Sequence, residues 1–181
     1  MKSDIKVVTN KVGRKNDVSF LLDSFMSLWE QQSTYNPNMP VRGLIYFGEL
    51  YDSYIEQKKL NIYGSKLVKL PTPQYIVFYN GKAEKESEEE LRLSNSFQQI
   101  DKSGRFEWTA RMININKGKN QELLEQCKPL ADYVTFITYI REYQKQGCTI
   151  NEAVDKSANK CMEEDVLREF LLKHRAEVFR V

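Results

Sequence analysis

The strongest constraint on the fold is the apolar segment at residues 74–79, Q-Y-I-V-F-Y, which Asn80 and Gly81 bring to an end. Its apolar residues are continuous, whereas in a strand with one solvent-exposed face apolar and polar residues would alternate. This pattern is typical of a strand that is buried on both faces. The sequence therefore predicts a sheet covered by helices.

A second constraint is a predicted hairpin. The short segments 18–22 (V-S-F-L-L) and 25–30 (F-M-S-L-W-E) are rich in β-branched and aromatic residues and flank Asp23 and Ser24. Two such segments around a polar pair indicate two antiparallel strands and a tight turn. A further strand is expected within residues 106–115, and the charged segment 82–90 is expected to be a loop within the sheet.

The segment between these strands is predicted to be helical. After Pro37 and Pro40, apolar residues recur at a spacing of three to four up to Ile55, which indicates an amphipathic helix. A proline in the first turn of a helix is tolerated because its missing amide would have no helical partner. Gly43 and Gly48 lower helix propensity and predict close packing against a neighbouring element.

Residues 121–181 are predicted to be helical throughout, with a helix near residues 133–143, one that starts at a T-x-x-E capping box (Thr149 and Glu152), and one at residues 162–174. The order is strands, helix, strands and then helices. The expected fold is α/β, with an α+β mixed sheet in residues 1–120 and a helical C-terminal region, residues 121–181, packed on the same domain.

Composition excludes several classes of protein and site. The net charge of +2 is too small to indicate a nucleic-acid partner, so any basic surface must be local. No apolar segment reaches 18 residues, so no membrane span is expected, and no secretory signal is apparent. Three cysteines are expected to be reduced thiols of a cytoplasmic protein. The single histidine, His174, is expected to be a helix-end residue, which argues against a Ser–His or Cys–His triad.

The hairpin predicts a pair of opposed carboxylates. With the turn centred on Asp23 and Ser24, Asp17 lies directly opposite Glu30, and Gln32 lies two residues further along on the same face. Opposed carboxylates repel each other unless a proton or a cation lies between them, and Mg²⁺ is bound by one or two carboxylates together with water and phosphate oxygens. The alternative is that Asp17 belongs to a turn and that Glu30 is solvated at a strand end.

Several motifs resemble one known family. They are N-D-V-S-F (16–20), W-E-Q-Q-S-T (29–34), N-P-N-M-P-V-R (36–42), G-L-I-Y-F (43–47), L-P-T-P (70–73), V-F-Y-N-G (77–81), L-R-L-S (91–94), I-N-I-N (113–116), C-K-P-L (127–130) and F-L-L-K-H-R-A-E-V (170–178). In this order they resemble the PD-(D/E)XK nuclease family transposases, which are Rpn-type recombination-promoting nucleases.

The resemblance implies a restriction-endonuclease-like core and a metal-dependent DNA endonuclease of bacterial mobile elements or recombination. It assigns Asp17 and Glu30 as ligands of Mg²⁺, or of Mn²⁺ in its place. Gln32 stands where the lysine of an E-x-K motif would orient the attacking water. Arg42, near the start of the predicted helix, is a candidate phosphate contact. DNA is the expected partner, and no organic cofactor or membrane is expected.

Two departures from the family pattern define the alternative function. Gln32 carries no charge and can only position water by hydrogen bonding. The family has a longer N-terminal region, whereas here only residues 1–15 precede the motif. The alternative is therefore a truncated, catalytically inactive relative that serves as a DNA-binding or protein-interaction module. A homodimer is compatible with the sequence.

Overall fold

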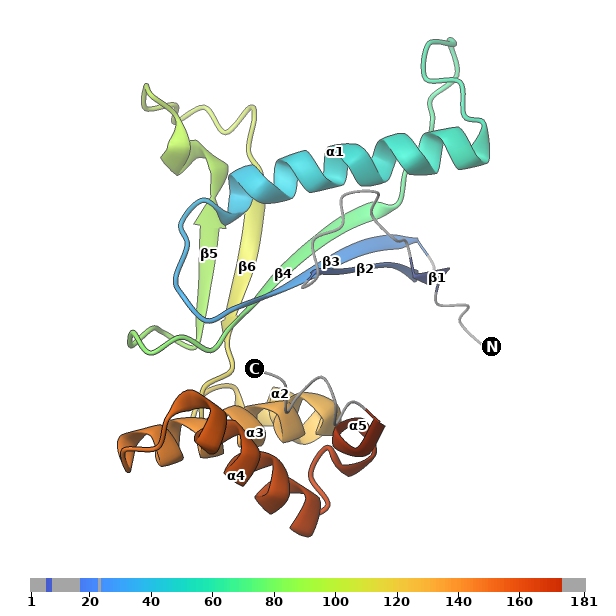
Figure 1. The fold of residues 1–181 in the computed structure, drawn as a ribbon. Coiled ribbons are helices and arrows are strands. Elements are labelled where there is room, and N and C mark those ends of the chain that lie inside the picture. Colours follow the sequence, from blue (N-terminus) through green and yellow to red (C-terminus); the bar gives the residue numbers. More distant parts are fainter. Residues whose placement is uncertain (1–5, 8–16, 23, 174–181) are drawn as a thin grey trace. The chain divides into compact units, whose positions relative to one another are not determined.

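The structure, a computed structural model, describes residues 6–7, 17–22 and 24–173 (Figure 1). The chain forms two compact units that meet in sequence between Asn114 and Ile115. The boundary predicted between residues 120 and 121 lies at the start of the first helix of the second unit. The packing of the helical region on the same domain stays a prediction.

The first unit is built on one mixed sheet. Within the described residues its strands are β1 (Lys6–Val7), β2 (Asp17–Leu22), β3 (Phe25–Gln32), β4 (Thr72–Tyr79), β5 (Glu88–Arg92) and β6 (Thr109–Asn114). Their order across the sheet is β1-β2-β3-β4-β6-β5. The central strands β3, β4 and β6 are parallel, and β2 and β5 run antiparallel to their neighbours. The predicted mixed α/β class is confirmed.

The register of the hairpin follows the count made from the sequence. Leu22 pairs with Phe25, Leu21 with Met26, and Asp17 with Glu30. The predicted turn is described only at Ser24, because Asp23 lies outside the described residues. The backbone of the two strands therefore places Asp17 directly opposite Glu30, as predicted.

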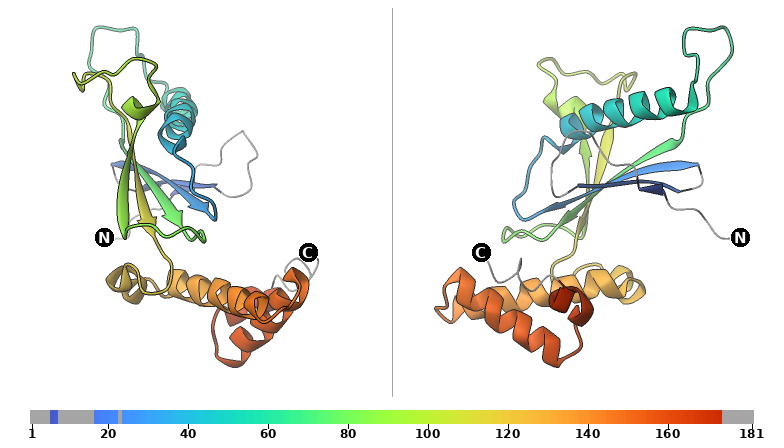
Figure 2. Two further views of the ribbon diagram at one scale, coloured as in Figure 1. Left: turned by 90° about the vertical axis from the view of Figure 1, so that its left-hand side faces the viewer. Right: turned by 45° about the vertical axis from the view of Figure 1, so that its right-hand side comes forward.

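Helix α1 (Met39–Lys58) connects β3 to β4 and covers one face of the sheet (Figure 2). Its start matches the prediction, because Pro40 occupies the first turn. The buried side chains of α1 meet those of the central strands in one core: Met26, Leu28, Met39, Tyr46, Phe47, Leu50, Tyr75, Val77, Tyr79, Leu91, Ala110 and Met112. Helix α1 is thus fixed to the sheet by apolar contacts along its length.

The strand at residues 74–79 is confirmed as β4, but its burial differs from the prediction. Tyr75, Val77 and Tyr79 are buried beneath α1, whereas Ile76 and Phe78, on the opposite face, are only half-buried. On that face Phe78 makes an edge-on contact with Trp29, with ring centroids 5.6 Å apart. The continuous apolar pattern overestimated burial because aromatic and β-branched residues also suit a strand face that is partly exposed.

The charged segment 82–90, predicted to be a loop, contains part of a strand. Residues 88–90 begin β5, which pairs with β6 at the edge of the sheet. Charged side chains are common on edge strands because they discourage further strand pairing. Here Arg111 of β6 binds Glu88 through two nitrogens, at 2.7 and 3.0 Å. The short 3₁₀ helix η1 (Leu93–Ser96) follows directly.

The second unit consists of helices in its described part: α2 (Gln121–Gln126), α3 (Lys128–Lys145), α4 (Ile150–Glu163) and α5 (Arg168–Lys173). The capping box is confirmed, since Thr149 and Glu152 bond each other's backbone amides at the start of α4. The helix predicted at residues 162–174 corresponds to α5, which begins later because a turn follows α4. His174 lies outside the described residues. No described helix is long and apolar enough to cross a bilayer.

Helices α3 and α4 are joined by a polar contact beside a small apolar core. The Tyr139 hydroxyl donates to Glu164 at 2.6 Å, and this bond raises the pKa of Tyr139 to about 12. Cys161 is fully buried nearby, and burial raises the pKa of its thiol to about 11. Among the described residues all three cysteines are free thiols, and a high pKa makes the Cys161 thiol a poor nucleophile at neutral pH.

The two glycines of α1 differ in their surroundings, which gives a test of the packing. A Cβ at Gly43 would overlap the Tyr75 ring and approach Nε1 of Trp108 to 2.9 Å, whereas a Cβ at Gly48 would meet nothing within 4 Å. Close packing is therefore confirmed at Gly43, and the same prediction for Gly48 is wrong.

We expect Gly43→Ala to lower the free energy of unfolding by about 1–3 kcal/mol, because the added methyl overpacks the core. Gly48→Ala should raise it by about 1 kcal/mol through helix propensity alone. Urea denaturation followed by circular dichroism measures both variants. Equal effects of the two substitutions would contradict the close approach of α1 to β4.

Candidate functional site

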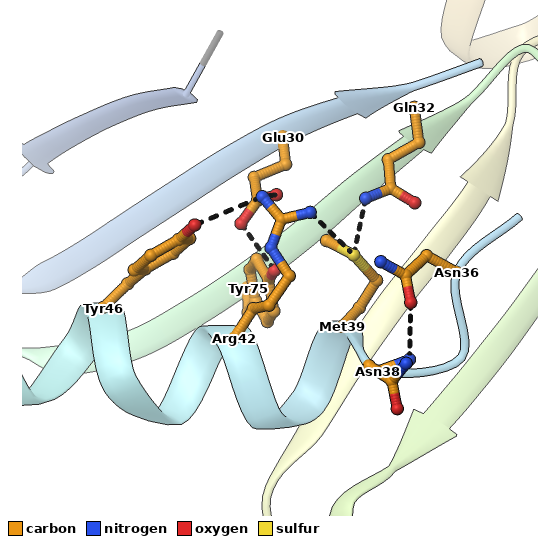
Figure 3. A network of polar contacts seen from close by, with 8 residues as sticks. All are labelled: Glu30, Gln32, Asn36, Asn38, Met39, Arg42, Tyr46 and Tyr75. Carbon is orange, nitrogen blue, oxygen red and sulfur yellow. Dashed lines mark hydrogen bonds and ion pairs between the residues drawn. The ribbon is translucent and has the colours of Figure 1, made fainter. Parts of the chain in front are cut away.

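The site is built where β3 passes beneath the first turns of α1 (Figure 3). Strand β3 directs Glu30 and Gln32 to the face that α1 covers, and Gln31 to the opposite face. The Glu30 side chain is only 1% exposed. A carboxylate is rarely buried to this degree without partners, because removing its charge from water costs several kcal/mol.

Both oxygens of Glu30 have a donor. The Tyr75 hydroxyl, from the neighbouring strand β4, donates to Oε1 at 2.7 Å. Nη2 of Arg42, from α1, lies 2.8 Å from Oε2 in an ion pair. Charge-assisted hydrogen bonds of this kind are about twice as strong as neutral ones. The carboxylate is therefore held as an anion by a cation from the helix and a hydroxyl from the sheet.

Arg42 links this carboxylate to the rest of α1. Its Nη2 also lies 3.2 Å from the Tyr46 hydroxyl, one helical turn further on, while its side chain remains 31% exposed. Partial burial opposes the charge of the guanidinium. The hydrogen bond to Tyr46 and the negative charge of Glu30 outweigh that effect and raise the pKa of Arg42. Arg42 is thus a permanent cation at the rim of the site.

The Gln32 amide is the third polar group of the site. In the orientation drawn in Figure 3, its nitrogen faces the sulfur of Met39 at 2.6 Å. Turning the amide over lets its nitrogen donate to the Thr34 carbonyl at 3.2 Å and its oxygen accept from Nη1 of Arg42 at 3.1 Å. We adopt the turned orientation, because a thioether is a weak acceptor and the guanidinium then meets an oxygen.

The segment between β3 and α1 sets the position of Arg42. The Asn36 side chain accepts from the Asn38 amide at 2.9 Å, which closes a local turn before the helix. The amide of Arg42 then donates to the Asn38 carbonyl at 3.1 Å, the first bond of the helical ladder. Pro37 inside this turn and Pro40 in the first turn of α1 both limit the backbone angles. The turn and the start of α1 together place Arg42 beside the carboxylate of Glu30, 12 residues earlier in the chain.

The register of the sheet relates the backbone of Asp17 to the site. Its backbone pairs with that of Glu30 on β2 and β3, so the two Cα atoms lie opposite each other. Among the side chains that the structure describes, which do not include that of Asp17, no group of three or more His, Cys, Asp or Glu could hold a metal ion. The metal site expected from the sequence therefore stays a prediction.

The structure brings together three of the residues singled out in the sequence: Glu30, Gln32 and Arg42. Arg42 lies against the Glu30 carboxylate, and its role as a phosphate contact stays a prediction. Sequence reasoning missed Tyr75 and Tyr46, which bond to Glu30 and Arg42. Tyr46 had a detectable signal, since it lies four residues after Arg42 on one helix face. Tyr75 had none, because its position depends on the register of a parallel strand pair.

Chemically, the site combines the buried carboxylate of Glu30, the amide of Gln32 and the guanidinium of Arg42. Apart from the Met39 thioether, the described ligand atoms that face it are oxygens and nitrogens without a thiol or an imidazole, and carboxylate oxygen favours a hard metal such as Mg²⁺. The Gln32 amide keeps one N–H beyond its bond to Thr34, and this group could orient a water molecule.

Comparison with protein-family models, curated proteins and solved structures finds no match to this chain.

The pair of Glu30 and Arg42 makes a testable prediction about stability. Arg42→Met should lower the free energy of unfolding by about 3 kcal/mol, because it leaves a buried carboxylate without its cation. Combining it with Glu30→Gln should recover at least half of that loss, since the buried charge is then removed as well. Urea denaturation of both single variants and of the double variant gives the coupling energy.

The matched control is Arg111→Met, which breaks the exposed ion pair with Glu88. That pair is solvated on both sides, so its loss should cost less than about 1 kcal/mol. If Arg42→Met costs no more than the control, the ion pair at Glu30 contributes little to the fold.

Proposed function

We propose that this chain is a Mg²⁺-dependent DNA endonuclease of the PD-(D/E)XK class, linked to recombination or mobile elements and using Mn²⁺ as a substitute metal. The observation that carries the proposal is the placement of Asp17 opposite Glu30, with Gln32 two residues further along β3. This is the arrangement that the resemblance to the PD-(D/E)XK transposases implies. We propose in addition that the first unit has a restriction-endonuclease-like core.

The topology around the site supports this proposal. A hairpin carries the acidic residues, helix α1 follows it, and β4 returns parallel to β3. The resemblance implies two acids on neighbouring strands of a small mixed sheet with flanking helices, and the strands β2 and β3 meet that description. The site also lies at the start of a helix, where backbone amides favour an anionic group such as phosphate.

The donor chemistry fits a hard divalent cation. Glu30 offers carboxylate oxygens that Tyr75 and Arg42 hold in one orientation, and oxygen is the ligand atom that Mg²⁺ prefers in proteins. The opposed pair of Asp17 and Glu30 would supply the one or two carboxylates that Mg²⁺ takes from a protein. When bound there, the metal would polarise a phosphodiester and lower the pKa of a water molecule.

The residues of the chain have separate tasks in this proposal. Tyr75 and Arg42 keep Glu30 ionised and fixed in one orientation. Gln32 orients the attacking water through its amide, where the lysine of an E-x-K motif would act. Arg42 supplies the positive charge that Gln32 lacks, because its Nη1 lies 3.1 Å from the turned amide oxygen. A fixed charge at this place would favour the charge that develops on the phosphate during attack.

A second candidate is a catalytically inactive relative that binds DNA or another protein. The observation in its favour is the ion pair itself, since Arg42 already compensates the buried charge of Glu30. A carboxylate with this partner needs no metal for the fold to be stable. Metal-dependent cleavage separates the two candidates.

The test is nicking of supercoiled plasmid DNA in Mg²⁺ or Mn²⁺ by the wild type and by Asp17→Asn and Glu30→Gln. We expect each variant to lose activity by about 100-fold or more, because even residues that only support a metal ligand cost 10–100-fold. The matched control is Glu90→Gln, an exposed carboxylate of the edge strand β5. A chelator should abolish wild-type nicking.

Two further measurements separate a loss of nicking from a loss of folding or of metal binding. Circular dichroism shows that each variant is folded, and calorimetric titration with Mn²⁺ shows whether metal binding is lost. Nicking that survives in both acidic variants would overturn the site. A folded wild type that neither cleaves nor binds Mn²⁺ would support the inactive relative.

The role given to Arg42 makes a separate prediction. Gln32→Lys should lower nicking, although it restores the lysine of the E-x-K motif, because its ammonium would lie beside the guanidinium. Like charges at this distance destabilise each other. Adding Arg42→Gln to Gln32→Lys should recover nicking, since one cation is then left. A Gln32→Lys variant that cleaves faster than the wild type would contradict the role of Arg42.

A further inference from the structure

The segment that follows α1 is an exposed surface that the site does not use. We call it the lysine loop and define it as residues 58–70, with the sequence K-K-L-N-I-Y-G-S-K-L-V-K-L. It extends from the C-terminal end of α1 and projects away from the sheet (Figures 1 and 2). Its base is fixed, because Tyr51 donates to the Pro71 carbonyl at 2.7 Å and Leu60 bonds back to Ile55.

The tip of the loop presents apolar side chains to solvent. Tyr63 is 95% exposed and Leu67 is 81% exposed, and Ile62 and Leu70 are also exposed. Local turns hold the tip in this form, since the amides of Tyr63 and Gly64 both bond to Asn61. A group of exposed apolar side chains on an ordered segment is typical of an interaction surface, whereas isolated ones are common everywhere.

The charge of the loop has one sign. Lys58, Lys59, Lys66 and Lys69 are all exposed, and the sequence contains no Asp or Glu from Gln57 to Ala83. Among the described residues the ion pairs of the first unit involve other side chains. Four exposed lysines around an aromatic tip, without an acid among them, complement a polyanion.

We infer that the lysine loop holds a single-stranded stretch of DNA, with its lysines on phosphates and the Tyr63 ring stacked on a base. This inference rests on the proposed function, which makes a DNA strand the polyanion at hand. Single strands suit the loop because their bases are accessible to an aromatic ring, and stacking on an aromatic side chain is worth about 1–3 kcal/mol per base. In a duplex the same bases would be covered.

Helix α1 sets the distance between this contact and the site. Arg42 lies in its first turns and Lys58 is its last residue, so the two are separated by about 24 Å at 1.5 Å per residue. A stacked strand advances about 3.4 Å per nucleotide and spans this distance with about seven nucleotides. The acidic side chains of Glu49, Asp52 and Glu56 are exposed along α1 between these two ends. Carboxylates repel phosphates, so the DNA strand would not contact the helix there. The loop would thus hold DNA at a distance from the bond that is cut.

Binding in the absence of divalent metal tests this inference without cleavage. We would measure fluorescence anisotropy of a labelled 20-nucleotide single strand over a range of salt concentrations. For Lys66→Gln with Lys69→Gln, the slope of log K against log salt should become shallower by about 0.7 per lost phosphate contact, or about 1.4 for the pair. Tyr63→Ala should weaken binding by about tenfold, whereas Tyr63→Phe should bind as the wild type does.

The matched control is Lys82→Gln with Lys102→Gln, which removes the same charge from exposed lysines elsewhere in the first unit. It should leave the salt slope within error of the wild type. Loop variants that bind the single strand as tightly as the control would overturn the inference. It is also overturned if the loop variants lose binding to phosphatidylserine vesicles while keeping their affinity for DNA, because the loop then binds a membrane surface.

The outcome can be separated from that of the proposed function. Binding uses no catalysis and can be repeated with Glu30→Gln protein, which lacks a proposed metal ligand. A loop-dependent affinity without nicking by the wild type would keep the inference and reject the nuclease. Nicking that depends on Glu30, together with unchanged binding by the loop variants, would keep the nuclease and reject the inference.

Discussion

The ion pair between Glu30 and Arg42 is the interaction on which the rest of the first unit depends. It compensates a charge that is almost fully removed from water, and it ties the first turns of α1 to the centre of the sheet. The next residue, Gly43, lets the helix pack closely against the ring of Tyr75, whose hydroxyl donates to the same carboxylate. Polar and apolar contacts therefore fix α1 at one place. A change at either partner would disturb the core and the candidate site together.

Local patterns in the sequence predicted much of this arrangement. The hairpin register follows from the position of a tight turn, so counting outward from it placed Asp17 opposite Glu30 correctly. The start of α1 followed from Pro40, and the start of α4 from the capping box. In each case the deciding contacts join residues that are only a few positions apart or that lie at equal distances from one turn.

The features that the sequence did not predict depend on contacts between distant segments. Tyr75 bonds to Glu30 across 45 residues, and its place follows from the register between β3 and β4. The strand character of residues 88–90 depends on pairing with β6, which overrides their low strand propensity. The half-exposed face of β4 could not be foreseen because periodicity reports which residues suit a strand and says nothing of what covers it. The lysine loop did have a signal, the absence of acids over 27 residues from Gln57 to Ala83, but the small net charge hid it.

The same difference in sequence separation bears on how the protein folds. Arg42 is 12 residues from Glu30 and can reach it once the hairpin and the first turns of α1 have formed. Tyr75 and the parallel strand β4 come from much further along the chain, and such pairings carry a larger loop-closure cost and form slowly. Glu30 can thus meet its cation before β4 pairs with β3. Because Arg42 follows Glu30 so closely along the chain, folding needs no stage in which the Glu30 carboxylate is buried without its cation.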